Sequence, residues 1–500
     1  MPTEVVLKAY KFALAPTKAQ EELLRRYAGA ARWAYNHAIA KKIRAHQEYR
    51  AQVDALVASG VPEDEARKRV KVPLPTKPSI QKEWVRTRGD SRKGIDGICP
   101  WWWEVNNYCF QSAFTDADAA WKNWLDSLHG KRAGRRMGYP RFKKKGRCRD
   151  SFRIHHNVKA PSIRWTTYRR LNIPKFGEIR IHGSGKRLAK MVAAGKAVIQ
   201  SVTVSRSGHR WFASVLCKIT VNLPDRPNRR QRTNGTIGVD IGVIHAMAFS
   251  KPVDLMDGKG PRDVVDNPRH LSAAMRRLKR AQRALSRTQP GSRRRERAQR
   301  RVARLHALVA QRRATWLHHI SKRLTTSFAT IVIEDLDVVN MTRSARGTRE
   351  NPGRNVRAKA GLNRSILDVA PGEFARQLDY KASWYGSTVH RVDRWFPSSK
   401  TCSVCGWQNP RLTLAERLFK CDRCGTVLDR DINAARNIAA QDSVAPDGGE
   451  TLNARGVLVR PAGSGQWARD GEAGRLLRES PQRSDPLAFP ALQEFGGRGP

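Results

Sequence analysis

The spacing of four cysteines constrains this chain more than any other feature of its sequence. Cys402 and Cys405 form one Cys-x-x-Cys pair, Cys421 and Cys424 form a second, and fifteen residues separate the pairs. Each pair can present two thiolates to one ion, so that two pairs complete a tetrahedral four-sulfur site. We expect one structural zinc ion, because a closed four-thiolate site leaves no position for a substrate. An iron–sulfur cluster or redox-active cysteines are the alternatives.

The remaining cysteines are scattered along the chain, at Cys99, Cys109, Cys148 and Cys217. Scattered cysteines beside two tight pairs indicate metal binding in a reducing cytoplasm, not a disulfide framework. No run of about 18 apolar residues is present, and the first residues lack the apolar stretch of a signal peptide. We therefore expect a cytoplasmic protein without a membrane span.

The charge of the chain is strongly unbalanced, with 95 Lys and Arg against 44 Asp and Glu, a formal net charge of +51. So many positive charges repel one another in a compact protein. The excess therefore favours a polyanionic partner, usually nucleic acid. A ribosome-associated or merely basic protein is the alternative.

Residues 271–323 concentrate this charge, with seventeen Lys and Arg and a single acid, Glu296. Apolar residues recur there at helical spacing and Pro290-Gly291 interrupts them, which predicts two helices with a buried face and a basic face. An ordinary solvated surface is less favoured, since solvated helices usually mix charges of both signs.

Acidic residues lie within or directly after predicted structural elements at three places in the chain. Asp240 lies inside the apolar strand IGVDIG, where an acid is costly unless it binds something, and Glu334 ends the apolar strand IVIE. Asp429 and Asp431 follow the cysteines in LDRDINAARNIAA. Carboxylates from two strands and a helix can hold two divalent ions that clamp the oxygens of a phosphodiester. Alternatively, Glu334 belongs to a solvated pair with Asp335; for Asp429 we favour a helix N-cap.

Eight segments in order along residues 1–440 carry a family resemblance: KAYKFALAPTKAQEELL, ARWAYNHA, YPRFKKKG, IGVDIG, IVIEDLDV, YKASWYG, VDRWFPSSKTCSVCG and LDRDINAARNI. With these segments the chain resembles the TnpB family, transposon-encoded RNA-guided DNA endonucleases related to the type V CRISPR effectors. One departure is VAPGEF at 369–374, where the family often has Trp before Gly-Glu-Phe.

The resemblance implies a RuvC-type catalytic triad that falls on Asp240, Glu334 and Asp431, the same residues holding two Mg²⁺ ions. Asp431 is chosen over Asp429 because the family's acid lies two residues before Asn-Ala-Ala, here Asn433 onward. It also implies a guide RNA and target double-stranded DNA as partners, alongside the one Zn²⁺ ion.

The expected fold is an α/β multidomain chain. It has a RuvC-like nuclease core (RNase H fold) with an inserted four-cysteine zinc ribbon, preceded by a β-barrel wedge domain that a helical recognition domain splits. The expected boundaries are 1–14 for the first wedge strand, 15–135 for the recognition domain, 136–232 for the wedge barrel, 233–397 for the first nuclease part with the basic hairpin, 398–428 for the ribbon, 429–440 for the last nuclease helix and 441–500 for a disordered tail.

Two basic clusters are candidate contacts to nucleic-acid backbone. Lys143, Lys144 and Lys145 lie in the YPRFKKKG segment, where an RNA contact and a plain solvated loop are equally compatible with the residues. Arg293, Arg294 and Arg295 begin the second helix of the basic hairpin.

Together these features predict an RNA-guided, Mg²⁺-dependent DNA endonuclease of a prokaryotic transposable element, acting on the nucleoid. The guide RNA would pair with one DNA strand, the protein would read a short motif beside the target, and one RuvC site would cut. A compact type V CRISPR effector and a non-cleaving RNA-guided DNA-binding repressor are alternatives. A DNA-strand transposase is a third, although no separate tyrosine or integrase-like site is evident.

Overall fold

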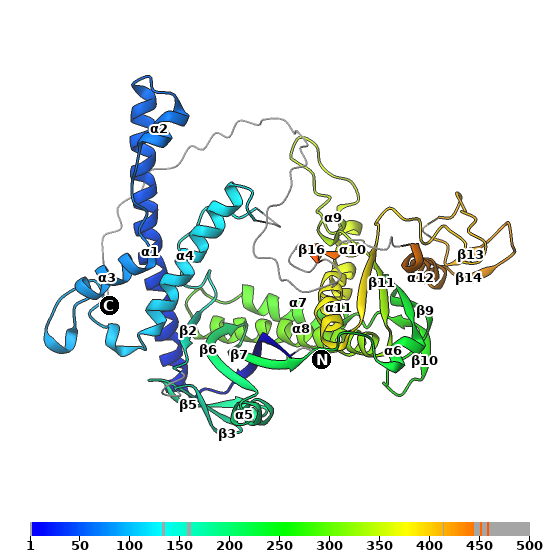
Figure 1. The fold of residues 1–500 in the computed structure, drawn as a ribbon, viewed down its shortest axis with the longest axis horizontal. Coiled ribbons are helices and arrows are strands. Elements are labelled where there is room, and N and C mark those ends of the chain that lie inside the picture. The colour runs from blue at the N-terminus through cyan, green and yellow to red at the C-terminus, as the bar shows by residue number, and fades with distance from the viewer. Residues whose placement is uncertain are drawn as a thin grey trace. The chain divides into compact units, whose positions relative to one another are not determined.

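A computed structural model gives the fold of the protein (Figure 1). The structure describes residues 3–132, 136–157, 162–413, 415–444, 451–452 and 458–459. The predicted disordered tail, 441–500, lies outside the described residues apart from the short helix η3 (Gln441–Val444) and the pairing of β15 (Thr451–Leu452) with β16 (Leu458–Val459). None of the helices in the described ranges is both long and apolar enough to cross a membrane.

The first sheet joins the start of the chain to strands that follow more than a hundred residues later. Its order is β2-β6-β7-β1-β5-β4-β3, with every pairing antiparallel. The strands are β1 (Thr3–Leu14), β2 (Ser151–His155), β3 (Arg164–Thr167), β4 (Arg170–Ile173), β5 (Gly177–His182), β6 (Ala197–Ser207) and β7 (Arg210–Asn222).

Strand β1 pairs with β7 along nearly its whole length, from Thr3 opposite Asn222 to Ala13 opposite Phe212. Alternate residues of β7 are buried, as a sheet with one covered face requires. Strands β2 and β3 stand at the two ends of the order, and among the described residues no pairing between them closes the sheet into the expected barrel.

Four helices lie between β1 and β2, of which α1 and α4 contact this sheet: α1 (Lys18–Ala58), α2 (Glu63–Arg69), α3 (Lys77–Thr87) and α4 (Tyr108–Leu128). Thr17 caps α1 and Gln20 reaches back to it, which forms a capping box. The apolar stripe of α1 is buried, with Leu24 and Tyr27 fully covered. Helix α4 packs against α1 and β2, so that α1, α3, α4 and the sheet share one hydrophobic core.

The second sheet has the order β10-β9-β8-β11-β12. Strands β8, β11 and β12 are parallel, so their carboxyl ends meet at one edge, while β9 and β10 continue the sheet antiparallel. The strands are β8 (Thr236–Asp240), β9 (His245–Asp254), β10 (Pro261–Asp266), β11 (Thr330–Glu334) and β12 (Thr388–Val392). Asp240 and Glu334 therefore end neighbouring strands at that edge.

The predicted basic hairpin forms as α7 (His270–Ser286) and α8 (Arg293–Ser327), which pack on each other. The carboxyl half of α8 buries Leu317, Ile320 and Leu324 against the second sheet and α11 (Pro371–Tyr385). Helix α10 (Val356–Val369) directly precedes α11. The remaining helices are α5 (Lys186–Ala193), α6 (Arg229–Asn234), α9 (Val338–Met341) and α12 (Arg430–Ala440).

Helix α12 lies directly on β8, at a place where only glycine fits. A Cβ atom built on Gly238 would stand 2.1 Å from the carbonyl oxygen of Ala435 and 2.5 Å from the backbone nitrogen of Ala439. The facing helix residues Ala434 and Ala435 are small and buried. The absence of a side chain on β8 thus allows backbone-to-backbone contact and fixes the position of α12 over the sheet.

We predict that Gly238→Ala destabilises the protein by at least about 1–3 kcal/mol, since the added methyl group meets backbone that cannot rotate away. Gly138→Ala is the matched control, because nothing lies within 4 Å of its Cβ position. Chemical denaturation of the two variants gives the comparison. Equal unfolding free energies would show that α12 is not seated on β8 as described.

Candidate functional site

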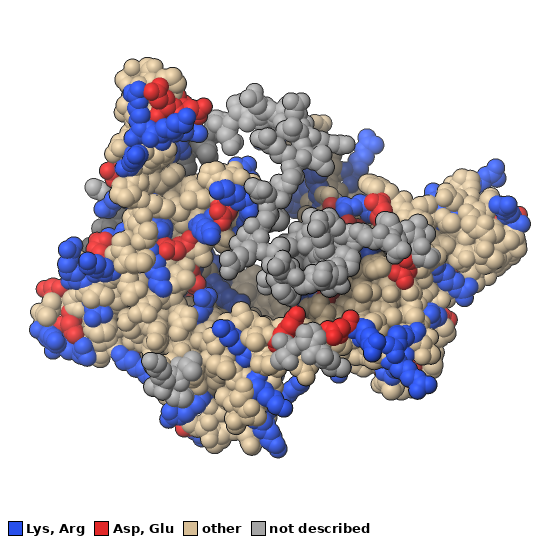
Figure 2. Space-filling view, viewed as in Figure 1, with Lys and Arg blue, Asp and Glu red and all other residues tan. Residues whose placement is uncertain are grey.

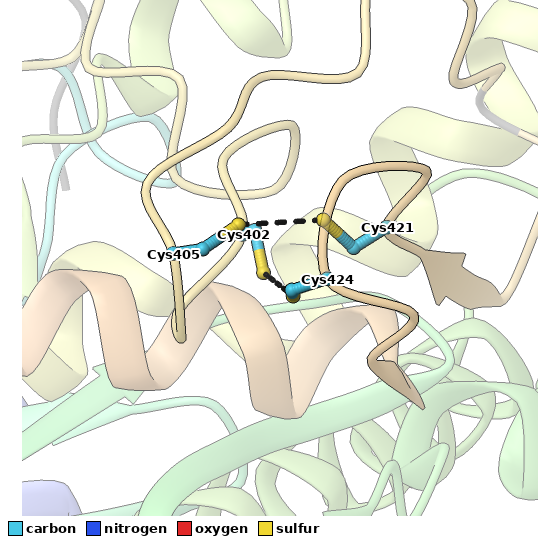
Figure 3. Close-up of side chains that lie close together, drawn as sticks. All are labelled: Cys402, Cys405, Cys421 and Cys424. Carbon is cyan, nitrogen blue, oxygen red and sulfur yellow. Dashed lines mark hydrogen bonds between the residues drawn. The ribbon is translucent and has the colours of Figure 1, made fainter.

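The four paired cysteines face one another from two loops (Figure 3). Cys402 Sγ lies 3.7 Å from Cys424 Sγ, and Cys405 Sγ lies 3.5 Å from Cys421 Sγ. A tetrahedron with zinc–sulfur bonds of about 2.3 Å has sulfur–sulfur edges of about 3.8 Å, whereas a disulfide brings sulfurs to about 2.05 Å. Within the described residues, these thiols are the one group of three or more potential metal ligands whose donor atoms all lie within 4.8 Å. The geometry is that of a four-cysteine metal site.

Both loops reach this geometry through the same backbone turn. Gly406 and Gly425, which follow each pair, have φ of 75° and 71°, a region that favours glycine. Their N–H groups donate to the carbonyl oxygens of Cys402 and Cys421, each over 3.0 Å. The Thr426 hydroxyl lies 3.0 Å from Cys424 Sγ, and its hydrogen bond lowers the pKa of that thiol to about 6. The site is therefore prepared for a cation that binds thiolate.

The metal site leads directly into α12. The strands flanking the second cysteine pair, β13 (Leu418–Lys420) and β14 (Val427–Asp429), form a hairpin. The last residue of β14, Asp429, caps α12 by accepting hydrogen bonds from the backbone N–H groups of Asp431 at 2.8 Å and Ile432 at 3.2 Å. The favoured capping role of Asp429 is thus what its contacts show.

Two asparagines of α12 hold the segment that precedes the first cysteine pair. Asn433 is fully buried; its side chain donates to the Thr401 carbonyl at 2.7 Å and accepts from the Ser403 N–H at 2.9 Å. Asn437 donates to the carbonyls of Ser398 and Thr401, at 2.7 and 2.6 Å. The metal site is therefore docked on α12 from both of its loops.

The structure brings Asp240, Glu334 and Asp431 together. The residues before Asp240 and Glu334 pair in adjacent parallel strands, Val239 opposite Ile333. Asp431 comes from the first turn of α12, and its Oδ2 atom lies 3.9 Å from the Cβ position of Gly242, just after Asp240. Sequence-distant acids thus meet at the carboxyl edge of the second sheet.

The environment of Asp240 raises the pKa of its carboxyl group to about 8. Enclosure by protein is the main cause, and the negative charges of Glu334 and Asp431 add to it. The Asp240 side chain keeps partial access to solvent at the end of β8. Burial, followed by the charge of Asp429, also raises the pKa of Asp431. Asp240 therefore binds its proton more tightly than a free aspartate does, and a cation that entered the site would displace that proton.

Glu334 is oriented by the chain that leads to the metal site. The hydroxyl of Ser398, a buried residue, donates to Glu334 Oε1 at 2.7 Å. The adjacent acid, Asp335, is bound by the Arg394 guanidinium at 2.7 Å, so it points to a different partner. The two neighbouring acids therefore have separate hydrogen-bond partners.

In each of the two predicted basic clusters, one residue contacts other parts of the protein and two are exposed. Lys143 is packed on α1, with Nζ 3.7 Å from the centre of the Tyr35 ring, while Lys144 and Lys145 are exposed. At the start of α8, Arg293 and Arg294 are exposed, but Arg295 donates to the Thr288 carbonyl at 2.9 Å and closes the hairpin turn. The exposed members alone remain available to a partner.

A groove of about 870 Å³ lies between α1, the 145–150 loop, the β6–β7 turn and α8. Basic side chains spread widely over the face of the protein shown in Figure 2. Seven basic residues against three acids, Glu22, Asp150 and Glu296, line the groove. The basic ones are Arg25, Arg26, Arg32, Lys145, Arg149, Arg206 and Arg300.

Sequence reasoning did not single out Ser398, Asn433 or Asn437. The asparagines stand four residues apart, the spacing of neighbours on one helix face, so their common orientation was readable. Their partners were not, because Ser398 and Thr401 lie more than thirty residues earlier in the chain.

Comparison with known proteins gives consistent matches along most of the chain. Family profiles match residues 215–345 ("Probable transposase", OrfB_IS605), 372–438 ("Cas12f1-like, TNB domain") and 1–51 ("Helix-turn-helix domain", OrfB_IS605). Residues 1–51 form β1 and most of the continuous helix α1 in this structure.

Three relatives described as "Putative RNA-guided DNA endonuclease" come from Mycobacterium tuberculosis, Escherichia coli and Streptomyces pristinaespiralis. The mycobacterial protein Rv2885c is 32% identical over 88% of this chain and 87% of its own length. The E. coli protein InsQ is 32% identical, with 87% and 92% covered. The Streptomyces protein is 30% identical, with 96% and 97% covered.

Cys421→Ser is expected to remove the metal ion from the four-cysteine site, because a serine hydroxyl does not replace a thiolate ligand. Elemental analysis of the purified protein should find about one zinc per chain in the wild type and much less in the variant. Cys148→Ser serves as control, since that cysteine stands apart from the cluster. Full zinc content in the Cys421→Ser protein would refute the assignment.

Asp240→Asn is expected to stabilise the protein in magnesium-free buffer at pH 8. The folded wild type keeps its Asp240 proton up to a pKa of about 8, whereas an unfolded aspartate loses it near pH 4. Wild-type stability therefore falls as pH rises from about 4 to 8, and the asparagine variant escapes this loss.

The difference in unfolding free energy between Asp240→Asn and the wild type should be small at pH 5. It should increase by on the order of 1–3 kcal/mol at pH 8. Urea unfolding at both pH values, with zinc left in place, measures it. A gap that is constant with pH would contradict the raised pKa.

Proposed function

This chain belongs to the TnpB family of OrfB/IS605-type transposable elements, and we propose that it is an RNA-guided DNA endonuclease that cuts double-stranded DNA at one RuvC-like site. The observation that carries the proposal is the meeting of Asp240, Glu334 and Asp431 at one sheet edge. Relatives that share about a third of their residues over nearly the whole chain carry the endonuclease description, which supports it.

On this proposal the three carboxylates would hold two Mg²⁺ ions. Bound there, the ions would supply activation of the attacking water and charge stabilisation at the leaving oxygen of the phosphodiester. Asp240 lies close enough to both other acids for their charges to act on it, and would help to hold the ions. The hydrogen bond from the Ser398 hydroxyl would orient the Glu334 carboxylate. The N-cap residue Asp429, which accepts from the Asp431 N–H, would position Asp431.

The four-cysteine site would hold one structural Zn²⁺ ion, because its four thiols leave no open coordination position. Its part in the reaction would be mechanical. The hairpin β13–β14 carries the cap of α12, and Asn433 and Asn437 tie the other loop to the same helix. Loss of zinc would therefore loosen the element that carries Asp431.

The helices α1–α4 and the first sheet would serve as recognition and wedge domains for the guide RNA and the target DNA. The groove between α1 and α8 supports this assignment, since basic residues from four separate parts of the chain converge there. A phosphate backbone is the polyanion that such a groove would take, without reading its sequence.

The non-cleaving repressor is disfavoured by the same site. A protein that only binds DNA gains nothing from three carboxylates crowded enough to raise the pKa of Asp240 to about 8. The crowding costs stability, and holding cations offsets that cost.

Asp240→Ala and Asp431→Ala are each expected to lower cleavage of a guide-matched plasmid by several orders of magnitude, because the ions lose a ligand. Guide RNA binding should persist in both variants. Asp429→Ala should cost only about 1 kcal/mol of helix capping and leave much of the activity.

The assay is plasmid cleavage with Mg²⁺ and the RNA that co-purifies with the protein. If Asp429→Ala abolished cutting while Asp431→Ala cut normally, the wrong aspartate would have been placed in the triad. Normal cutting by Asp240→Ala, or the absence of any enriched RNA on the wild-type protein, would overturn the function itself.

The groove yields a separate prediction about binding. Replacing Lys145 and Arg300 together by Gln should weaken binding of all target sequences alike and reduce the slope of affinity against salt by about 2. Arg164 and Arg169, exposed on and beside β3 and outside the groove lining, give a control with the same charge change. Equal effects in both double variants would show that only net charge matters.

A further inference from the structure

Trp395 is 84% exposed, the highest fraction of any large hydrophobic side chain that the structure describes. It follows β12, whose last residue, Val392, pairs with Glu334. Exposure of an indole ring to water is unfavourable, because burial of its apolar surface lowers the free energy. Its position at the edge of the proposed nuclease site suggests a partner that arrives there.

The backbone on both sides of Trp395 is held in place. Its own N–H donates to the Asp393 carboxylate at 2.7 Å, and the next N–H, of Phe396, donates to the Asp393 carbonyl at 3.1 Å. The Phe396 side chain packs against a buried cluster of the second sheet and α12. The preceding side chain, Arg394, is bound to Asp335 at 2.7 Å. The ring therefore stands out from an anchored loop.

This loop ends at the proposed catalytic residues. Ser398, three residues after Trp395, donates its hydroxyl to Glu334. Three residues span at most ~11 Å of extended chain. The backbone of Trp395 thus lies within about 11 Å of Ser398, a separation that a DNA strand bridges with a few nucleotides.

The surroundings of Trp395 match a single flat heterocycle better than a protein surface. Its exposed neighbours Asp393, Arg394 and Lys400 are charged, so the ring stands alone and no continuous apolar patch surrounds it in this segment. Protein interfaces bury a contiguous apolar centre, whereas a base needs only one ring face, whatever the base.

We propose that Trp395 is a stacking platform for an unpaired nucleobase of the DNA strand that enters the Asp240–Glu334–Asp431 site. The inference rests on the proposed endonuclease function. Stacking would hold the strand in register, so that one phosphate stays in front of the carboxylates. Trp395 is accordingly a substrate-binding residue and takes no part in proton or phosphoryl transfer.

The test places 2-aminopurine, a base that is bright when unstacked and dim when stacked, at successive positions of a guide-matched target on either strand. The protein carries its co-purified RNA and Asp240→Asn, which prevents cutting. With Trp395 present, one or two positions that have left the duplex should stay dim. With Trp395→Ala the same positions should brighten, and with Trp395→Phe they should brighten only partly.

Cleavage by proteins with Asp240 intact provides the second measurement. Trp395→Ala should raise KM roughly tenfold, as expected for the loss of one base–aromatic stack, and Trp395→Phe should recover most of the loss. Tyr380→Ala, which removes another exposed aromatic ring, on α11, should change neither measurement. The unfolding midpoint of Trp395→Ala should equal that of the wild type, since the ring is exposed.

Identical 2-aminopurine profiles with and without Trp395, on a target whose strands have separated, would overturn the stacking proposal while leaving the nuclease function standing. A change in sedimentation of Trp395→Ala with unchanged fluorescence would instead assign the ring to contact between copies of the chain, and would equally overturn it. If no position brightened in any guide-loaded protein, the strands would not be opening and the proposed function itself would fail.

Discussion

The contact of α12 with β8 at Gly238 is the constraint on which the proposed site depends. Because a Cβ there would strike the Ala435 carbonyl at 2.1 Å, the helix can lie against the strand only through bare backbone. That contact carries Asp431 toward Asp240 and presents Asn433 and Asn437 to the chain before the cysteines. The metal site, the cap at Asp429 and the hydrogen bond from Ser398 to Glu334 all attach to the same helix or its immediate neighbours.

The three neighbouring carboxylates repel one another when all are ionised, and the proposed binding of cations would relieve this repulsion. Enclosing Asp240 beside two other acids raises its pKa to about 8, which costs folding stability at neutral pH unless cations enter. The surrounding structure resists this repulsion through neutral hydrogen bonds and packing: the Ser398 hydroxyl on Glu334, the buried asparagines and the alanine face of α12. On the proposed function, these carboxylates would lower the folding stability of the metal-free protein, and binding of Mg²⁺ would restore it.

How far the sequence predicts this structure differs from residue to residue. Local signals sufficed for the cysteine pairs, the Thr17 capping box and the break of the basic hairpin at Pro290-Gly291. The expected closed barrel is not seen, since strand pairing across the ends of a sheet leaves no local signal. The packing of Lys143 on Tyr35, the partners of Asn433 and the exposure of Trp395 depend on residues distant in sequence, so no window of sequence contains them.

The most direct test of the account is the location of divalent ions in the protein bound to guide RNA and target DNA, with Mn²⁺ in place of Mg²⁺ and cleavage blocked by a phosphorothioate at the cut position. Anomalous scattering identifies Mn²⁺ apart from other density. Two Mn²⁺ ions are expected beside the cut phosphate, held by Asp240, Glu334 and Asp431. Mn²⁺ bound elsewhere on the protein, with none between these carboxylates at saturating concentration, would contradict it.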